Sequence, residues 1–306
     1  MRITNEIIIQ KAKSNGFDLV GFAKADSLKE EISHLEEWLV KGYQAEMSYM
    51  DKNVDKRKDV SNILQNAKSV ISLGLNYYHN IKFSNNPGRG KVSRYAWGKD
   101  YHLIIWEKLS RLESELKEID HNFESKSYVD TGPVMDKVWA VKSGLGWMGK
   151  HTNLINKEFG SWFFLATIIT NFEFDYAIPI PDFCGTCTAC MDACPTSAIV
   201  NPYIVDSNKC ISFLTIENKN EISDEFKGKF NNWIFGCDIC QDVCPWNIKF
   251  SQGTSSEDFN HPENMELNLN EVLEMSEEGF KSKFFNSPVK RTKLSGLKRN
   301  AKFLLQ

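Results

Sequence analysis

Residues 184–195 read CGTCTACMDACP, in which four cysteines follow the pattern CxxCxxCxxxCP. This is the cysteine spacing of bacterial two-cluster ferredoxins. Three thiolates on one tight loop can reach three irons of one [4Fe–4S] cubane, whereas the fourth cysteine, next to the proline, points towards a second cluster. The segment therefore predicts a ferredoxin-like fold around two clusters in this part of the chain.

A second cysteine group, residues 237–245, repeats the end of this pattern as CDICQDVCP. Ile234 stands where its leading cysteine would be, and Cys210 is the one other cysteine in the chain. If Cys210 replaces the missing ligand and the two groups exchange their last cysteines, all eight thiolates are used. The predicted ligands are then Cys184, Cys187, Cys190 and Cys244 for the first cluster, and Cys194, Cys210, Cys237 and Cys240 for the second.

Structural zinc is the alternative for these cysteines, because two zinc sites with four thiolates each would also use all eight. Zinc ribbons, however, usually supply separate CxxC pairs rather than the run CxxCxxCxxxCP. The spacing therefore favours iron–sulfur clusters over zinc.

All eight cysteines of the 306-residue chain lie between Cys184 and Cys244, and the first 183 residues contain none. A disulfide framework would instead spread cysteines through a small secreted domain. The N-terminus lacks the apolar core of a signal peptide, and no stretch approaches the roughly 18 apolar residues that cross a membrane. We therefore expect a cytoplasmic protein with reduced thiols and no membrane partner.

Hydrophobic residues make up 42% of the chain and charged residues 25%, as in globular proteins. Helices and strands alternate across residues 1–175, which predicts a layered α/β or α+β domain. The predicted strands are 17–23, 69–76, 125–129 and 161–170; the predicted helices are 4–15, 30–40, 101–119 and a helix through 141 that Asp130-Thr131-Gly132-Pro133 opens. We expect three regions, residues 1–175, 176–250 and 251–306.

The net charge of −3 conceals an asymmetry near the C-terminus. Residues 251–280 contain eight acidic side chains and no Lys or Arg, whereas residues 281–306 contain eight basic side chains and no acid. The basic block could be the solvated face of a helix. A phosphate-binding surface explains it better, because phosphate contacts dominate nucleic-acid affinity.

The whole set of motifs resembles the epoxyqueuosine reductase family. Besides the two cysteine groups, the matching stretches are DKR (55–57), SRYAWGKDYH (93–102), YVDTGPVMD (128–136), GWMGKHTNL (146–154), GSWFFL (160–165), CISFLTIE (210–217) and SPVKRTKLSGLKRN (287–300). These stretches extend over nearly the whole chain and keep one order. Their combination makes the resemblance specific.

The resemblance implies an α+β fold in which a nitroreductase-like cobalamin-binding domain precedes a ferredoxin-like domain with two [4Fe–4S] clusters and a short, basic C-terminal helical segment. It implies reduction of epoxyqueuosine to queuosine at the wobble position of tRNA. The cobalamin would be base-off, and the chain indeed lacks the DxHxxG motif, since Ile105 replaces its glycine. An external low-potential electron donor would feed the clusters, and we expect a monomer.

The resemblance also implies roles for individual residues. Asp130 would be the proton donor, for which it must be buried beside the corrin; from the sequence alone, an N-cap of the following helix is the simpler interpretation. The implied cobalamin contacts are Arg57, Tyr95, Ala96, Trp97, Asp130, His151, Asn153, Leu154, Ser161 and Trp162. Arg57 lies in a charged run that could be a solvated face, and the aromatic residues could be core.

The glycine-rich stretch 144–149 matches the string GxGxxG, but it follows a predicted helix rather than a strand. As a nucleotide fingerprint it is therefore weak, and backbone approach to a large planar ligand is as good an interpretation. For tRNA, the resemblance and the charge pattern indicate Ser212, Thr215, Glu217, Lys219, Lys290, Arg291, Lys298 and Arg299.

Two other functions are compatible with the cysteine pattern. A cobalamin-dependent reductive dehalogenase combines similar domains, but it usually carries a twin-arginine export signal and has no use for a basic C-terminal segment. A ferredoxin-like electron-transfer protein with a partner-binding N-terminal domain would not take up cobalamin. Cofactor content and an assay on modified tRNA separate the three.

Overall fold

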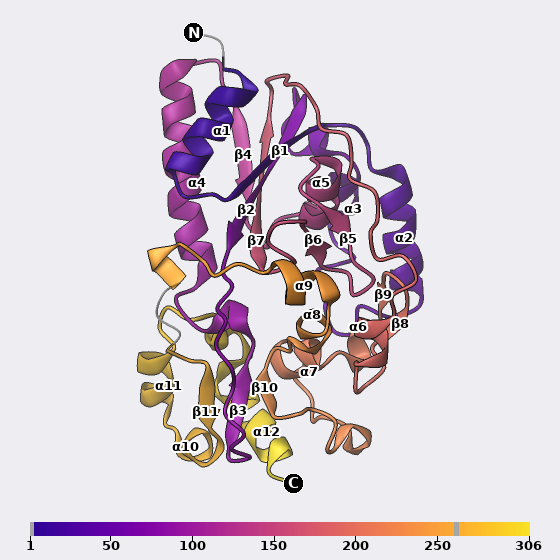
Figure 1. Cartoon of the computed structure of the whole chain (residues 1–306), viewed down its shortest axis with the longest axis vertical. Helices are drawn as coiled ribbons and strands as arrows, with labels where there is room; N and C mark the ends of the chain where they lie inside the picture. The colour runs from indigo at the N-terminus through magenta and orange to yellow at the C-terminus, as the bar shows by residue number, and fades with distance from the viewer. Residues whose placement is uncertain (1–2, 260–262) are drawn as a thin grey trace.

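The computed structural model describes residues 3–259 and 263–306. Its N-terminal part is built on a four-stranded antiparallel sheet in the order β1-β2-β7-β4 (Figure 1). The strands are β1 (Leu19–Lys24), β2 (Ser69–Asn76), β4 (Ser125–Tyr128) and β7 (Phe163–Thr170). Every residue of β2 is buried, because this strand lies inside the sheet and helices cover both faces.

Side chains of β2 alternate between the two cores on either side of the sheet, as a strand requires. Ile71 and Leu73 enter the core beneath α1 (Asn5–Ser14) and α4 (Tyr101–Ile119). Val70 enters the opposite core, which α2 (Lys29–Val40), α3 (Val54–Lys58) and α5 (Asp136–Lys142) cover. The sheet is therefore the middle layer of three.

The cysteine-bearing part consists of short elements. They are α6 (Ala189–Asp192), β8 (Ile199–Asn201), β9 (Ile204–Val205), η3 (Ser207–Lys209), α7 (Ile211–Ile216), η4 (Asp224–Phe226), β10 (Trp233–Phe235), α8 (Ile239–Asp242) and α9 (Pro245–Phe250). Cys244 is the N-cap residue of α9, and Pro245 occupies its first turn. Proline suits that position because the first helical N–H has no intrahelical acceptor.

A three-stranded sheet, in the order β10-β3-β11, joins distant parts of the chain (Figure 1). β3 (Arg89–Val92) belongs to the N-terminal region by sequence, yet it pairs in parallel with β10 and antiparallel with β11 (Glu266–Asn268). Val92 and Trp97 share a core with residues of the C-terminal segment. The three sequence regions stay a prediction. Residues 89–97 belong to the first region, but they pack against residues of the second and third.

The remaining elements complete the chain. They are η1 (Val60–Asn62), η2 (Arg94–Ala96), β5 (Trp147–Met148), β6 (Leu154–Ile155), η5 (Glu257–Phe259), α10 (Leu269–Glu274), α11 (Glu277–Lys283), η6 (Pro288–Thr292) and α12 (Lys293–Leu304). Among the helices of the described residues, none combines the length and the apolar character that a membrane crossing requires.

The mixed content of helices and strands confirms the predicted α+β class, and the predicted bounds of 69–76 and 101–119 match β2 and α4. The helix predicted to open at Asp130 is wrong in its start. Residues 129–135 form a loop, and α5 begins at Asp136 with Met135 as its N-cap residue. Asp130 therefore does not cap this helix.

Candidate functional site

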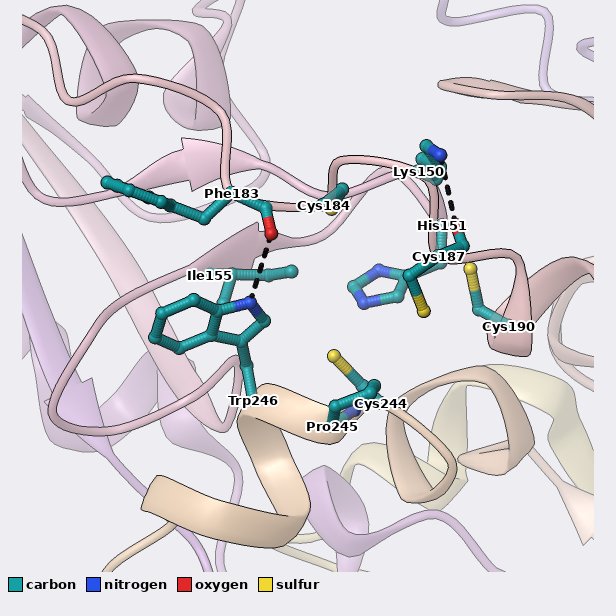
Figure 2. A pocket seen from close by; sticks show the side chains of 10 residues that line it. All are labelled: Lys150, His151, Ile155, Phe183, Cys184, Cys187, Cys190, Cys244, Pro245 and Trp246. Atoms are coloured by element: carbon teal, nitrogen blue, oxygen red, sulfur yellow. Dashed lines mark hydrogen bonds between the residues drawn. The ribbon is translucent and has the colours of Figure 1, made fainter.

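Four cysteines from both sequence groups surround one cavity of about 160 Å³ (Figure 2). They are Cys184, Cys187, Cys190 and Cys244, the set predicted for the first cluster. Burial and then the charges of the other three thiols raise the pKa of Cys190 to about 11. Four thiolates so close together need a cationic partner, because a coordinated metal is what deprotonates such thiols.

The other four cysteines form a second group. Burial raises the pKa of the Cys240 thiol, and the charges of Cys210, Cys190 and Cys194 add to this effect. The pKa of the Cys237 thiol is raised by burial and then by Cys240, with a smaller effect from Cys210. These mutual effects bring together the set predicted for the second cluster, and the effect of Cys190 on Cys240 shows that the two groups are neighbours.

The segment before β6 holds the loop of the first group. The Nζ of Lys150 donates to the carbonyl oxygens of Gly185 and Cys187, at 2.6 and 2.9 Å. His151 lines the cavity beside the cysteines (Figure 2). Burial and then the charge of Lys137 lower the pKa of His151 to about 4. The ring of His151 thus faces the cysteine cavity, and its contact with cobalamin stays a prediction.

Asp130 lies in the loop after β4, with a φ of 57°. The hydroxyl of Tyr101 donates to its Oδ2 at 2.7 Å, and the Nε2 of His102 lies 3.9 Å from the same oxygen. The side chain of Asp130 is 68% exposed. The two neighbours come from the first turn of α4, so one end of that helix orients the carboxylate while leaving it open to a ligand.

Lys137 lies between Asp130 and the second cysteine group, because the charges of both act on it; we refer to the surface around it as the recess. Lys137 is open to solvent, yet desolvation by the surrounding protein lowers its pKa, while the charges of Asp130, Cys240 and Cys210 oppose that change. Its Nζ donates to Thr152 O and to Asn153 Oδ1, at 2.9 and 3.0 Å. The side chain of Lys137 is exposed, so a ligand that approaches Asp130 from solvent can also reach it.

Two more residues border this recess. Burial raises the pKa of Tyr95, and the charge of Asp130 contributes next. Burial also raises the pKa of Asp136 to about 6, and Asp130 and Arg57 act on the same carboxyl. Tyr95, Arg57, Asn153 and Asp130 are therefore the predicted cobalamin contacts that the fold gathers around one recess.

Basic residues of the C-terminal segment stand at the mouth of the recess. The Nζ of Lys290 lies 2.9 Å from Asp100, whose other oxygen is 2.8 Å from His102 Nδ1. Arg291 donates twice to Glu217, at 2.9 and 3.1 Å. The charges of Glu217, Arg291, Asp130 and Arg57 all act on the half-buried Tyr49 hydroxyl, whose pKa burial raises. Two of the predicted basic tRNA contacts thus lie near Asp130.

Five predicted cobalamin contacts have side chains that the protein itself covers: Ala96, Trp97, Leu154, Ser161 and Trp162. Trp97 packs in the C-terminal core. The hydroxyl of Ser161 donates to Gln241, and its backbone N–H donates to Asn247, so it joins the sheet to α8 and α9. The burial of these side chains favours their interpretation as core, and their contact with cobalamin stays a prediction.

Two predicted tRNA contacts have side chains that are engaged in hydrogen bonds within the protein. Thr215 is 0% exposed, and its hydroxyl donates to Ile211 O and accepts from Gly236 N. The guanidinium of Arg299 donates to the carbonyl oxygens of Leu214, Asn218 and Asn220. Both residues therefore stabilise the region around α7. Lys219 is exposed, and Ser212 and Lys298 are partly exposed.

Three residues of the site were not predicted from the sequence: Tyr101, His102 and Lys137. Tyr101 and His102 lie in the stretch SRYAWGKDYH. Two ionisable side chains at the start of a predicted helix could have indicated a site there. Lys137 carries no local signal, because its place beside the recess depends on how α5 packs.

Comparisons with known proteins agree with this geometry. Residues 183–247 match the family model described as a 4Fe-4S double cluster binding domain, and residues 57–131 match the model described as epoxyqueuosine reductase QueG, DUF1730. The fold, the two cysteine groups and these matches define an iron–sulfur oxidoreductase.

The curated relatives give the family. Epoxyqueuosine reductase of Cellulophaga algicola is 49% identical over 301 residues, which cover 98% of this chain and 97% of the relative. Epoxyqueuosine reductase of Leadbetterella byssophila is 49% identical over 304 residues, or 99% of both chains. The chain belongs to the epoxyqueuosine reductase family.

Two solved structures show the same fold. A crystal structure of epoxyqueuosine reductase with an epoxyqueuosine-modified tRNA-Tyr stem loop matches with a TM-score of 0.92 at 37% identity, covering 98% of this chain and 80% of that one. The Bacillus subtilis enzyme, described with its aspartate-bearing catalytic loop swung out of the active site, matches with a TM-score of 0.91 at 35% identity and the same coverage. Membership of this family favours the reduction of epoxyqueuosine over reductive dehalogenation or simple electron transfer.

Proposed function

We propose that this chain reduces epoxyqueuosine to queuosine at the wobble position of tRNA, with base-off cobalamin and electrons from two [4Fe–4S] clusters. One observation carries the proposal: the recess at Asp130 lies between the second cysteine group and the basic residues Lys290 and Arg291. Electrons can enter this recess from one side and a polyanion can approach it from the other. The relative solved with a modified tRNA stem loop supports the choice of substrate.

The cysteine cavity fits a cubane better than a single zinc ion. Four of the eight cysteines line one cavity, and the match of residues 183–247 to a double cluster binding domain supports cubanes over zinc. We assign Cys184, Cys187, Cys190 and Cys244 to the first cluster and Cys194, Cys210, Cys237 and Cys240 to the second. Cys187 is exposed, so the first cluster would receive electrons from an external donor, and the second would face the recess.

The recess also suits cobalamin. A large flat ligand there would contact Tyr95, Asn153 and Lys137 and would cover the carboxylate of Asp130, whereas the buried Arg57 would act on it through its charge. The chemistry that cobalamin supplies is that of low-valent cobalt, which gives the substrate electrons at a carbon–oxygen bond. The protein supplies position, exclusion of water and a proton.

Asp130 is the group that we assign to proton transfer. The Tyr101 hydroxyl occupies Oδ2 and leaves Oδ1 free to carry a proton towards the departing epoxide oxygen. Burial and the charge of Asp130 raise the pKa of Tyr101, so this hydroxyl keeps its proton and serves to orient the carboxyl group. Because Asp130 is 68% exposed in the free protein, a bound cofactor and tRNA would have to supply its burial.

The metal content tests the cluster assignment. Protein purified without oxygen is expected to contain about eight irons per chain, because two cubanes of four irons match the eight cysteines. Elemental analysis with EPR of the reduced protein measures this directly. Stoichiometric zinc with negligible iron would overturn the assignment. Reconstitution with cobalamin, followed by nucleoside analysis of treated tRNA, tests the activity itself.

The basic residues at the mouth of the recess are expected to make tRNA binding sensitive to salt. A variant with Lys290, Arg291 and Lys298 changed to Ala should bind tRNA more weakly. The slope of log affinity against log salt concentration should also become shallower by about 0.7 for each phosphate that the variant leaves without its cation. Arg299 is left intact because its guanidinium supports α7. Fluorescence anisotropy at several salt concentrations measures both quantities.

A matched control removes three cations from the other end of the molecule. Lys11, Lys13 and Arg111 lie on α1 and α4, and Lys11 and Arg111 pair with surface glutamates as Arg291 does. Their change to Ala should leave tRNA affinity unaltered. Unchanged binding by the Lys290, Arg291 and Lys298 variant would remove this segment from the proposed tRNA interface.

A further inference from the structure

The glycine-rich segment 144–151 contains two buried ring N–H groups that lack an acceptor. The indole Nε1 of Trp147 and the Nε2 of His151 have no hydrogen-bond partner among the residues that the structure describes. Trp147 is 1% exposed and His151 is 4% exposed. Buried polar groups are almost always paired, so two orphan donors in one short segment indicate an acceptor that binds there.

The hydrogen bonding of His151 determines which ring nitrogen carries the proton. Its Nδ1 accepts the backbone N–H of Asn153 at 3.1 Å. A nitrogen that accepts in this way has no proton, so the neutral ring carries its proton on Nε2. In Figure 2 the ring lies among the cysteine side chains, between Cys187 and Cys244. The unpaired N–H therefore belongs to a side chain that lines the cavity of the first cysteine group.

Trp147 approaches the same cysteines from another side. It packs with Cys244, Cys184 and Trp246 in one apolar cluster. Its indole N–H is directed towards the Cys184 sulfur without making a hydrogen bond to it. Trp147 therefore presents an unpaired donor beside the first cysteine group.

The backbone at Gly149 passes close to the His151 ring and limits its movement. A Cβ at this position would lie 2.9 Å from His151 Cε1 and 2.7 Å from Ile155 Cδ1, closer than atoms in contact normally come. Only glycine lets the backbone pass so near the ring, so the segment holds the imidazole in one orientation. The glycines thus shape a donor loop around the cysteine cavity.

We infer that Trp147 and His151 donate hydrogen bonds to sulfurs of the first iron–sulfur cluster and raise its reduction potential. This inference rests on the cluster assignment in the proposed function. Reduction adds negative charge to the cluster, and N–H dipoles aimed at its sulfurs stabilise that charge. A higher potential makes the first cluster a readier acceptor for electrons that arrive at the exposed Cys187.

The second cysteine group has donors of another kind. Backbone N–H groups of Phe213 and Ser212 face Cys210, and that of Ile239 faces Cys237. Side-chain substitutions in the donor loop leave these backbone groups in place. Only one of the two cluster potentials should therefore respond.

The test is an EPR-monitored redox titration of the iron-loaded protein and its variants His151→Leu, His151→Gln and Trp147→Phe. Loss of either donor should move the reduction equilibrium of one cluster about tenfold towards the oxidised form, which is about 59 mV for a one-electron couple. The other potential should stay unchanged. His151→Gln keeps an amide N–H near the position of Nε2 and should restore most of the wild-type value.

Trp139→Phe is the matched control. Trp139, a residue of α5, is also fully buried, and its Nε1 has no partner among the described residues. It packs against residues of α2, in a core that contains no cysteine. Unchanged potentials in His151→Leu and Trp147→Phe at full iron content would overturn the inference, and so would an equal shift in Trp139→Phe. If His151→Leu loses iron, the reduction potential of Trp147→Phe tests the inference in its place. Absence of iron from the wild-type protein would instead refute the cluster assignment.

Discussion

The Asp130→Asn variant is expected to turn over epoxyqueuosine tRNA about 10²–10⁴-fold more slowly than the wild type, because this is the usual contribution of a general acid. Asn keeps the size of the side chain and can still accept the hydrogen bond from Tyr101 through its oxygen. It has no acidic proton to give to the departing oxygen. Single-turnover rates at saturating tRNA measure the loss.

The interpretation of this variant depends on unchanged cofactor content. Iron should remain at the wild-type level, because the cysteines do not contact Asp130, and cobalamin should remain bound, because Asn keeps the size of the side chain and the hydrogen bond from Tyr101. Asp26→Asn is a fitting control, since its side chain is also 68% exposed and pairs with the nearby surface residue Lys24. Near-wild-type turnover by Asp130→Asn with cobalamin bound would contradict the proton-transfer role.

The fold was most predictable where burial repeats along the chain. In α4, Ile105, Leu109, Leu112 and Leu116 recur at helical spacing, and all four are fully buried. The start of α5 was not predictable in the same way. Asp130 and Pro133 resemble an N-cap and a first-turn proline, but Tyr101, which is distant in sequence, takes the carboxylate and keeps the segment a loop.

The candidate site shows the same division between local and distant information. Seven of the eight cysteines follow local patterns with a fixed geometric demand, so they could be predicted from spacing, whereas Cys210 was assigned because it is the one cysteine left. Whether Trp97 or Trp162 lines a cofactor or fills a core depends on which elements pack against it, and both prove to be core. Tyr101, His102 and Lys137 meet at the recess through tertiary packing that no stretch of sequence records.

The Cys210→Ala variant is expected to lose about four of its eight irons and all detectable turnover. Cys210 completes the second group, and its charge acts on both Cys237 and Cys240. In the proposed function the second cluster faces the recess, so its loss should interrupt electron delivery to the substrate. Iron analysis and activity on modified tRNA measure the two effects.

Double variants test how the two groups share their cysteines. Cys194→Ala combined with Cys210→Ala should retain about four irons, because both residues are assigned to the second cluster. Cys187→Ala combined with Cys210→Ala should lose all of them, because each change then removes a different cluster. Equal iron contents in the two double variants would contradict the exchange of cysteines between the sequence groups.

A cysteine at position 234 should not replace Cys210, although the sequence pattern alone would put a ligand there. Ile234 is 0% exposed and packs in the C-terminal core, with its Cβ so close to Gly90 that a side chain on that glycine would meet it at 2.7 Å. Strand β10 thus turns this side chain away from the other cysteines and towards β3. Adding Ile234→Cys to Cys210→Ala is therefore expected to restore neither iron nor turnover, whereas recovery of eight irons would show that β10 can present a ligand to the second cluster.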